Sequence, residues 1–356
     1  MTTDLKVGVI GLGWAGQQHL DAYSTIDGVE IIAVAAMEQD LLAAAAEKYA
    51  VANTFARWED LLELEGLDAI SVAVPNFLHA PIAIAALERG IHVLSEKPIA
   101  RNGDEGQQMV DAARAAGRVL DVAFNHRRRG DIQALKGAID RGEVGRPYFA
   151  KAAWLRRQGI PMLGSWFTNP ALAGGGPLAD IGVHVLDYAL DLLGEPEVLA
   201  VSASTYSELG PRGLGGNAQY SAAATDHAFG VEDFATAFLR LEGGATLLIE
   251  AGWASYRNPD DEMNFLVYGT DGGAELRVAG DPGELRIFRD NGAENADYSP
   301  EVGESGMHLG VVIDFVAAVR AGEEEWKRHD GSLALKRTRV IDACYASARE
   351  GREVQL

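Results

Sequence analysis

One segment near the N-terminus constrains the fold of this chain more than any other. An apolar run, Val7-Gly8-Val9-Ile10, leads directly into Gly11-Leu12-Gly13-Trp14-Ala15-Gly16, which has the form Gly-x-Gly-x-x-Gly. In such strand-turn-helix units, Gly11 permits the tight turn, Gly13 lets backbone N–H groups approach a pyrophosphate, and Gly16 lets the helix pack closely on the strand. The anion lies at the helix N-terminus. The segment indicates a dinucleotide site, although the glycines alone would also suit an ordinary tight turn.

Strand-like and helix-like segments alternate from residue 5 to residue 122. This alternation is typical of a parallel sheet whose strands are joined by crossover helices. The predicted strands are Val7–Ile10, Ile31–Ala35, Thr54–Phe55, Ala69–Val74, His92–Ser95 and Val119–Phe124, and the predicted helices are Gln17–Ser24, Leu41–Tyr49, Trp58–Leu62, Pro81–Arg89 and Gly103–Ala116. We therefore expect an α/β fold in which residues 1–124 form a Rossmann domain with a doubly wound parallel sheet.

A different pattern begins at residue 125. Helices are predicted over 131–141 and 181–193, with a long irregular stretch between them, followed by strands over 148–154, 197–205, 233–241, 245–253, 264–269, 274–278 and 285–289. Short glycine-rich links favour antiparallel pairing. We predict that residues 125–356 form an α+β domain with a large open, mostly antiparallel sheet, closed by helices over Met307–Ala321 and Ser332–Arg349. Residues 207–231, rich in Gly, Ala and Ser, are expected to form a long insertion.

Charge and cysteine content narrow the function classes. The 356 residues include 52 acidic and 31 basic side chains, a formal charge of −21, which would repel nucleic-acid phosphates and anionic membrane surfaces. Neutral or weakly charged small-molecule substrates suit such an acidic chain better. The single cysteine, Cys344, is expected to be a buried core residue. With neither an export signal nor a long apolar stretch in view, we predict a cytoplasmic protein without a membrane span.

Two predicted strand ends in the first domain carry polar side chains. Ligands of doubly wound sheets bind outside the carboxyl ends of the strands, so Pro75 and Asn76 are predicted to contact the cofactor. His79 is predicted either to do the same or to cap and pack the next helix. The next strand ends in Ser95-Glu96-Lys97-Pro98, which favours a catalytic Lys97 over an ordinary surface lysine, with Pro98 as a candidate cis proline.

A glycine-rich loop in the second domain leads into a helix that carries an acid and an imidazole. Asp180 and His184 are four residues apart in the run that begins at Gly174, so both project from one helical face. The aspartate can orient the imidazole, which can take a hydroxyl proton. An i,i+4 surface pair is the other interpretation. The spacing does not suit zinc, because there is no His-Glu-x-x-His sequence and no paired cysteines, so no metal is expected.

Together, Gly11-x-Gly13-x-x-Gly16, Glu96-Lys97-Pro98 and Asp180-x-Gly182-x-His184 resemble the Gfo/Idh/MocA-family oxidoreductases, the group that includes glucose-fructose oxidoreductase and inositol dehydrogenase. The resemblance covers essentially the whole chain. It extends to Asn125-His126-Arg127 and to Val231-Glu232-Asp233-Phe234.

The resemblance implies NAD(P)-dependent oxidation of a secondary alcohol of a sugar, glycoside or cyclitol, or reduction of the ketone. Lys97 would contact the nicotinamide ribose and the reacting hydroxyl, His184 would be the general base or acid, and Asp180 would orient it. The expected cofactor-binding set is Gly11, Gly13, Trp14, Ala15, Gly16, Ala36, Met37, Glu38, Pro75, Asn76, His79, Glu96, Lys97 and Asn125. A homodimer or homotetramer through the open face of the C-terminal sheet is also implied.

The stretch after the second strand bears on cofactor choice. Family members that use NAD commonly carry an Asp there, whereas this chain reads Ala36-Met37-Glu38. Ala36 cannot accept hydrogen bonds from the ribose, but Glu38 can be expected to reach it. No Arg or Lys in the stretch indicates a pocket for a 2′-phosphate, so NAD is favoured over NADP.

Substrate contacts are predicted from Lys97, Arg127, Arg156, Trp166, Asp180 and His184. Aromatic faces cover the C–H patches of a sugar ring and guanidinium groups donate to its oxygens, although Trp154 and Trp166 would serve equally well as loop anchors. Two other functions stay open. One is a glycosidase that uses tightly held NAD for oxidation, elimination and re-reduction, and the other is a non-catalytic dinucleotide sensor.

Overall fold

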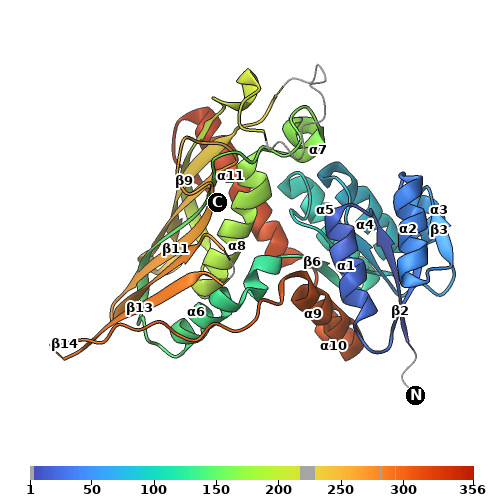
Figure 1. The fold of residues 1–356 in the computed structure, drawn as a ribbon, viewed down its shortest axis with the longest axis horizontal. Coiled ribbons are helices and arrows are strands. Elements are labelled where there is room, and N and C mark those ends of the chain that lie inside the picture. Colours follow the sequence, from blue (N-terminus) through green and yellow to red (C-terminus); the bar gives the residue numbers. More distant parts are fainter. Residues whose placement is uncertain (1–3, 217–228, 281, 293) are drawn as a thin grey trace. The chain divides into compact units, whose positions relative to one another are not determined.

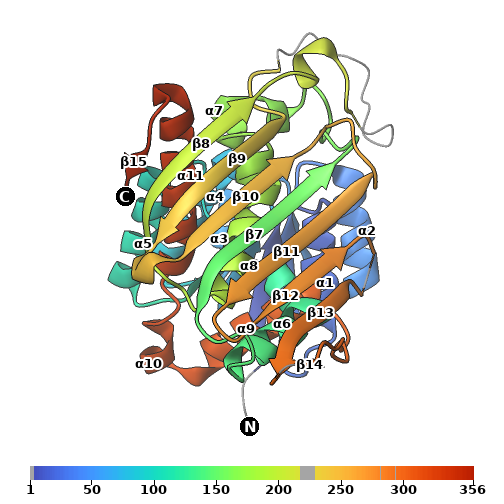
Figure 2. The ribbon, with the colours of Figure 1, turned by 90° about the vertical axis from the view of Figure 1, so that its left-hand side faces the viewer.

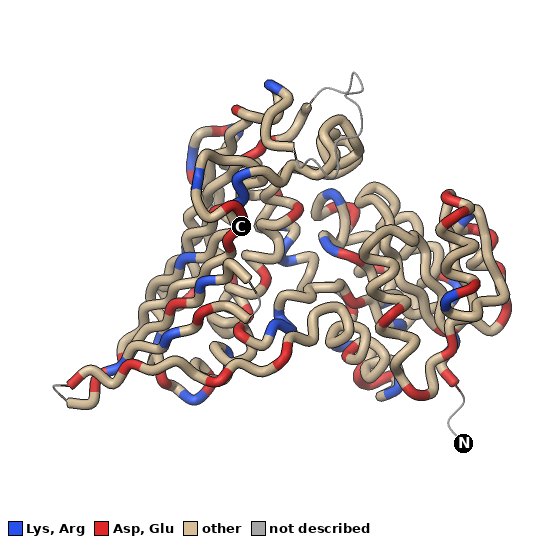
Figure 3. Tube along the Cα trace, viewed as in Figure 1, with Lys and Arg blue, Asp and Glu red and all other residues tan. Residues whose placement is uncertain are grey.

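The computed structural model describes residues 4–216, 229–280, 282–292 and 294–356. Contacts divide the chain into two compact units (Figure 1). Unit 1 comprises residues 1–125 and 306–338, and unit 2 comprises residues 126–305 and 339–356. Aspartates and glutamates are spread over both units with lysines and arginines between them (Figure 3).

Unit 1 contains the predicted doubly wound sheet. Its six strands are all parallel, in the order β3-β2-β1-β4-β5-β6. The strands are β1 (Leu5–Ile10), β2 (Val29–Ala35), β3 (Asn53–Phe55), β4 (Ala69–Val72), β5 (His92–Ser95) and β6 (Leu120–Val122). The helices between them are α1 (Trp14–Ser24), α2 (Gln39–Tyr49), α3 (Trp58–Leu62), α4 (His79–Glu88) and α5 (Gly103–Ala116). The sheet order reverses at β1 and β4, which places the carboxyl ends of these strands at the usual ligand position of such folds.

One helix predicted for the second domain belongs to unit 1 instead. Helix α9 (Met307–Ala321), followed by α10 (Glu323–Trp326), lies in unit 1. Val312, Phe315 and Val316 are buried in a core cluster that includes Leu20 and Tyr23 of α1. The expectation that residues 307–321 close the C-terminal domain is therefore wrong. An apolar stripe on a helix shows that the helix is buried, but it does not show which sheet it covers.

Unit 2 is built on a nine-stranded, mostly antiparallel sheet, as predicted. The order is β14-β13-β12-β11-β7-β10-β9-β8-β15, and the parallel pair is β7 with β10. The strands are β7 (Pro147–Arg156), β8 (Val198–Tyr206), β9 (Phe234–Leu241), β10 (Thr246–Gly252), β11 (Asp261–Gly269), β12 (Gly272–Val278), β13 (Glu284–Asn291), β14 (Glu294–Asn295) and β15 (Val354–Gln355). The short strands β14 and β15 are additions to the predicted set.

Helices of unit 2 cover one face of this sheet. They are α6 (Gly130–Asp140), which packs against β12 and β13, and α8 (Val183–Leu192), which packs against β7 and β10. Helix α7 (Pro170–Ala173) and the second half of α11 (Ser332–Glu350) also belong to unit 2. Figure 2 looks onto the opposite face, with α6 and α8 behind the strands. On the open face Leu248 is paired across strands with Phe238, and Tyr268 stacks on Phe149 with ring centroids 5.8 Å apart. This face also carries charged side chains, among them Lys151 and Glu250, which form an ion pair at 2.7 Å.

The predicted insertion over residues 207–231 is described only at its two ends. A short 3-10 helix, η5 (Gly210–Arg212), follows β8. Residues 217–228 lie outside the described residues. Among the helices that are described, none combines the length and the apolarity needed to cross a membrane.

The placement of α9 predicts an asymmetric response to truncation of its side chains. Phe315 is fully buried, whereas Ile313 on the same helix is 46% exposed. Phe315→Ala should lower the free energy of unfolding of unit 1 by about 3–5 kcal/mol because it leaves a cavity. Ile313→Ala, the matched control, should cost less than about 1 kcal/mol. Hydrogen exchange of the α1 amides reports the loss, and equal protection in the two variants would contradict the assignment of α9 to this core.

Candidate active site

The glycine-rich turn of unit 1 has two crowded glycines and one open glycine. Gly11 has a φ of +92°, and a Cβ at Gly16 would lie 1.9 Å from the carbonyl oxygen of Gly11. A Cβ at Gly13 would meet no heavy atom within 4 Å. Gly13 is also the N-cap of α1 and provides no side-chain cap, so Trp14 and Ala15 begin the helix. This turn therefore offers backbone N–H groups and space for an anion, as the sequence predicts.

The segment after β2 places an exposed carboxylate beside this turn. Gly11 N donates to the carbonyl of Ala35, the last residue of β2, at 2.8 Å. Ala36 follows, Met37 is 82% exposed, and Glu38 is the exposed N-cap residue of α2, with no capping bond from its side chain. Glu38 therefore follows closely on the strand end that is hydrogen-bonded to Gly11.

The two predicted strand-end loops are joined by His79. Its ring is fully buried, with Nδ1 2.8 Å from the carbonyl oxygen of Pro98 and Nε2 2.9 Å from that of Val74. Burial lowers the pKa of His79, so the neutral ring donates to one carbonyl at a time. Of the two roles left open for His79, packing at the helix start is the one that this geometry matches. Asn76 is also buried, in the 3-10 turn η1 (Asn76–Leu78).

Lys97 lies in the loop that His79 supports. It is partly buried, and the Lys97–Pro98 peptide bond is cis, as the sequence suggested. Its backbone N–H donates to Glu96 Oε2 at 3.2 Å. The conformation at Lys97 is thus tied to the side chain before it.

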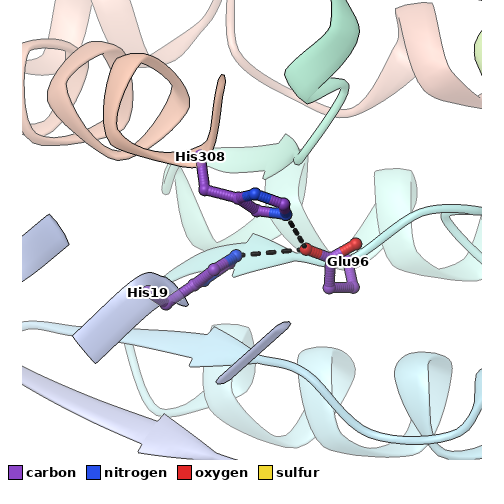
Figure 4. Close-up of side chains that lie close together, drawn as sticks. All are labelled: His19, Glu96 and His308. Atoms are coloured by element: carbon purple, nitrogen blue, oxygen red, sulfur yellow. Dashed lines mark hydrogen bonds and ion pairs between the residues drawn. The ribbon is translucent and has the colours of Figure 1, made fainter. Parts of the chain in front are cut away.

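Glu96 is the centre of a buried hydrogen-bond network (Figure 4). Its Oε1 accepts from His19 Nε2 at 3.1 Å, and His308 Nε2 of α9 lies 3.5 Å from the same oxygen. His19 Nδ1 accepts from Ser71 Oγ at 2.8 Å, and Ser71 in turn accepts from Tyr23. Burial opposes ionisation of Glu96, yet the hydrogen bonds from His19 and His308 hold its pKa well below the usual range.

His308 connects this network to two predicted cofactor residues. Its ring meets the Trp14 ring edge-to-face at 5.1 Å, and its Nδ1 lies 3.2 Å from Asn125 Nδ2. Sequence reasoning missed His308, which lies far along the chain from the other members. The donor atoms of His19, Glu96 and His308 all lie within 4.8 Å of one another, close enough to hold a metal ion. The contacts among these three side chains are also those of hydrogen bonds from the two histidines to Glu96, and Asn125 Oδ1 beside them is buried without a hydrogen-bond partner among the described residues.

In unit 2 the Asp180 side chain lies in a π-helical turn, η4 (Leu178–Gly182), that runs into α8. Such single wide turns are frequent at functional sites. Asp180 Oδ2 accepts a hydrogen bond from Trp253 Nε1 at 2.9 Å, and Trp253 is fully buried. His184 lies in the first turn of α8 and is 6% exposed. The sequence predicted an uninterrupted α-helical face here, and the π turn modifies it.

Three aromatic and basic side chains lie near His184. The His126 and His184 ring centroids are 4.6 Å apart, and Trp154 lies 4.8 Å from His126 and 6.0 Å from His184. The guanidinium of Arg156 lies 4.8 Å from the Trp154 ring, and both side chains donate to Asp261. An imidazole beside an aromatic face and a guanidinium suits a polyhydroxylated ring. His126 was not chosen as a site residue, although the run Asn125-His126-Arg127 contained the signal.

Two predicted substrate residues lie in other settings. Arg127 donates to Asp187 at 2.6 Å through both Nε and Nη2, and also to Asp191 and Glu195. This is the arrangement of a structural ion pair. Trp166 stacks on Phe167 with ring centroids 3.8 Å apart.

Comparisons with known proteins agree with this architecture. A family model described as "Oxidoreductase family, NAD-binding Rossmann fold" matches residues 5–124, and one described as "GFO/IDH/MocA C-terminal domain" matches residues 132–275. A D-glucoside 3-dehydrogenase of Escherichia coli K12 is 32% identical over 357 residues, covering 100% of this chain and 98% of the relative. A levoglucosan dehydrogenase of Pseudarthrobacter phenanthrenivorans is 32% identical over 317 residues, covering 80% of this chain and 79% of the relative. A solved levoglucosan dehydrogenase in complex with NADH superposes with a TM-score of 0.84 at 25% identity, covering 99% of each chain.

The lowered pKa of Glu96 predicts a specific acid response. Because the folded pKa lies below the unfolded value of about 4.3, the ionised carboxylate stabilises the fold above that pH, and the contribution is lost on acidification below it. Glu96→Gln should lower the melting temperature at pH 7, and the gap to the parent chain should narrow between about pH 5 and pH 3. Glu63→Gln, which removes an exposed ion pair with Arg89, is the control. A gap that stays constant with pH would contradict the prediction.

Proposed function

Because the chain belongs to the Gfo/Idh/MocA oxidoreductase family, we propose that it is an NAD-dependent dehydrogenase of a neutral sugar, glycoside or cyclitol. It would interconvert a secondary alcohol and its ketone. The observation that carries the proposal is the grouping of His184, His126, Trp154 and Arg156 in unit 2. A relative that spans the whole chain is named a D-glucoside 3-dehydrogenase, which favours a glycoside as substrate.

The turn of unit 1 fits a dinucleotide. Gly13 leaves the approach to the α1 N-terminus open, and the helix has no side-chain cap of its own. The Glu38 carboxylate would accept from ribose hydroxyls and repel a 2′-phosphate, which favours NAD over NADP. When bound, NAD⁺ supplies the acceptor for the substrate hydride. Pro75, Asn76, Glu96 and Asn125 complete the proposed cofactor set.

We assign the proton transfer to His184. In oxidation the neutral imidazole takes the hydroxyl proton, and in reduction the imidazolium returns it. Asp180 would stabilise the charged His184 ring and fix its orientation. The Asp180 carboxylate is in turn held by the hydrogen bond from Trp253. Lys97 would contact the reacting hydroxyl and the nicotinamide ribose. With a hydride acceptor bound, transfer of the hydroxyl proton to His184 would leave the substrate as its ketone.

Oligomerisation would use the open face of the nine-stranded sheet. Phe149, Phe238, Leu248, Leu266 and Tyr268 lie at cross-strand positions on that face. A homodimer or homotetramer would remove these five apolar side chains from water. The cytoplasm stays our expected location, since the lone Cys344 thiol is buried and needs no oxidising compartment.

The chemistry is tested by reduced-nicotinamide formation with NAD and NADP in parallel, against monosaccharides, glycosides and inositols. Lys97→Ala and His184→Ala should each lower kcat by roughly 10²–10⁴-fold, the usual contribution of a positioned acid or base, and NAD affinity should stay within about a factor of three in His184→Ala. Ile313→Ala is the control. Near-parent rates in either variant would overturn its assigned role, and NAD binding without turnover of any substrate would favour the dinucleotide sensor or the glycosidase with bound NAD.

The geometry of Gly13 and Gly16 predicts that substitution of the first affects cofactor binding and substitution of the second affects stability. Gly13→Ala should leave the melting temperature of the free protein within about 2 °C, because its φ of −64° suits alanine and its Cβ meets nothing. It should nevertheless weaken NAD binding at least tenfold. Gly16→Ala, whose Cβ would lie 1.9 Å from the Gly11 carbonyl oxygen, should destabilise unit 1 itself. Calorimetric titration and thermal melts measure both effects, and unchanged NAD affinity in Gly13→Ala would place the pyrophosphate elsewhere.

A further inference from the structure

A buried carboxylate closes the loop that precedes the π turn of unit 2. Glu232, which is 7% exposed, accepts from Gly176 N through Oε2 and from Leu178 N through Oε1, both at 3.0 Å. Tyr345 Oη of α11 donates to Oε1 at 2.8 Å. Glu232 thus joins a loop, a helix start and a C-terminal helix.

Glu232 accepts hydrogen bonds from the N–H groups of the two residues that flank Pro177, the N-cap residue of the π turn. The first N–H groups of a helix have no partners within the helix, and a carboxylate at that end is favoured by the helix dipole. Pro177 has no N–H of its own. Glu232, which is distant in the sequence, therefore accepts from the backbone N–H groups on both sides of Pro177.

The loop at Gly175 and Gly176 also packs closely against Tyr345 and Glu232. A Cβ at Gly175 would lie 2.0 Å from Tyr345 Oη, and a Cβ at Gly176 would lie 2.2 Å from the carbonyl oxygen of Glu232. Only glycine fits at both positions. Glu232 and Tyr345 thus set where the loop lies, as well as satisfying its donors.

The same segment holds Asp180 from a second side. Asp180 N donates to the carbonyl of Gly176 at 3.0 Å, and Asp180 Oδ2 accepts from the Trp253 indole at 2.9 Å. Trp253 N donates to the carbonyl of Asp233 at 3.0 Å. The Glu232 side chain therefore holds the start of the helix. The Asp233 carbonyl binds Trp253, whose indole in turn donates to the Asp180 carboxylate.

We propose that Glu232, backed by Tyr345, is a positioning residue for the proton transfer assigned to His184, because it sets the start of the helix that carries Asp180 and His184. The inference rests on the proposed function. Glu232 touches neither substrate nor cofactor in this assignment. Its effect is on the geometry of the acid-base pair, where a displacement of about 1 Å costs as much as 10²-fold in rate.

The test compares Glu232→Gln with Asp131→Asn. Both carboxylates are buried in unit 2 and accept two backbone N–H bonds, Asp131 from Ile132 and Gly283. A glutamine offers one acceptor oxygen where Glu232 offers two, so one flanking N–H loses its partner. We expect Glu232→Gln to lower kcat by about 10–100-fold, with the KM for sugar and the Kd for NAD within threefold. Tyr345→Phe leaves both hydrogen bonds from the backbone N–H groups to Glu232 in place, so its kcat should lie between that of Glu232→Gln and that of the parent.

Asp131→Asn should lower the melting temperature but keep kcat within threefold. A Glu232→Gln enzyme with parental kcat, or an equal loss of kcat in Asp131→Asn, would overturn the proposal. Amide exchange at Leu178 and Asp180, and NMR titration of the His184 ring, provide a second arm that needs no turnover. If the parent oxidises no sugar, a change in this arm confined to Glu232→Gln and Tyr345→Phe supports positioning while the proposed function fails. Unchanged exchange and titration in both variants overturn the positioning role.

Discussion

The hydrogen bonds that Glu96 accepts hold together parts of unit 1 that are far apart in the sequence. His19 comes from the helix after the glycine-rich turn, Glu96 from the end of β5, and His308 from α9. A buried carboxylate is stable only when its oxygens accept hydrogen bonds. The segments that carry His19, Glu96 and His308 therefore have to pack together for Glu96 to be buried. The glycine-rich turn, the Lys97 loop and α9 are thus mutually dependent through one side chain.

Unit 2 solves a similar problem with a different carboxylate. Glu232 accepts from the N–H groups at the start of the helix that bears Asp180 and His184, and the Tyr345 hydroxyl donates to the same carboxylate. In both units a buried glutamate holds a loop that carries a proposed catalytic side chain. At Glu96 the histidine donors outweigh the cost of burial and lower its pKa, whereas at Glu232 burial outweighs the backbone and tyrosine donors and raises its pKa. In both cases the hydrogen bonds fix the geometry of the loop.

Much of the fold could be predicted because hydrophobic periodicity and glycine placement report local structure. The six parallel strands were found from their alternation with helices, and Gly11, Gly13 and Gly16 from the turn that they form. The position of α9 could not be predicted in this way, since Phe315 and Val312 show a buried helix face without showing its partner. His308 was missed for the same reason: it becomes significant only beside Glu96.

The amino-acid sequence by itself determined the two sheet types, the dinucleotide turn and the identity of Lys97, Asp180 and His184 as candidates, because each follows from residues close together in the chain. Tertiary structure alone decided which distant side chains meet. It placed His126 and Trp154 beside His184, engaged Arg127 with Asp187, Asp191 and Glu195, and brought Glu232 to the helix start. Those outcomes depend on the packing of strands and helices across hundreds of residues, and no local spacing encodes them.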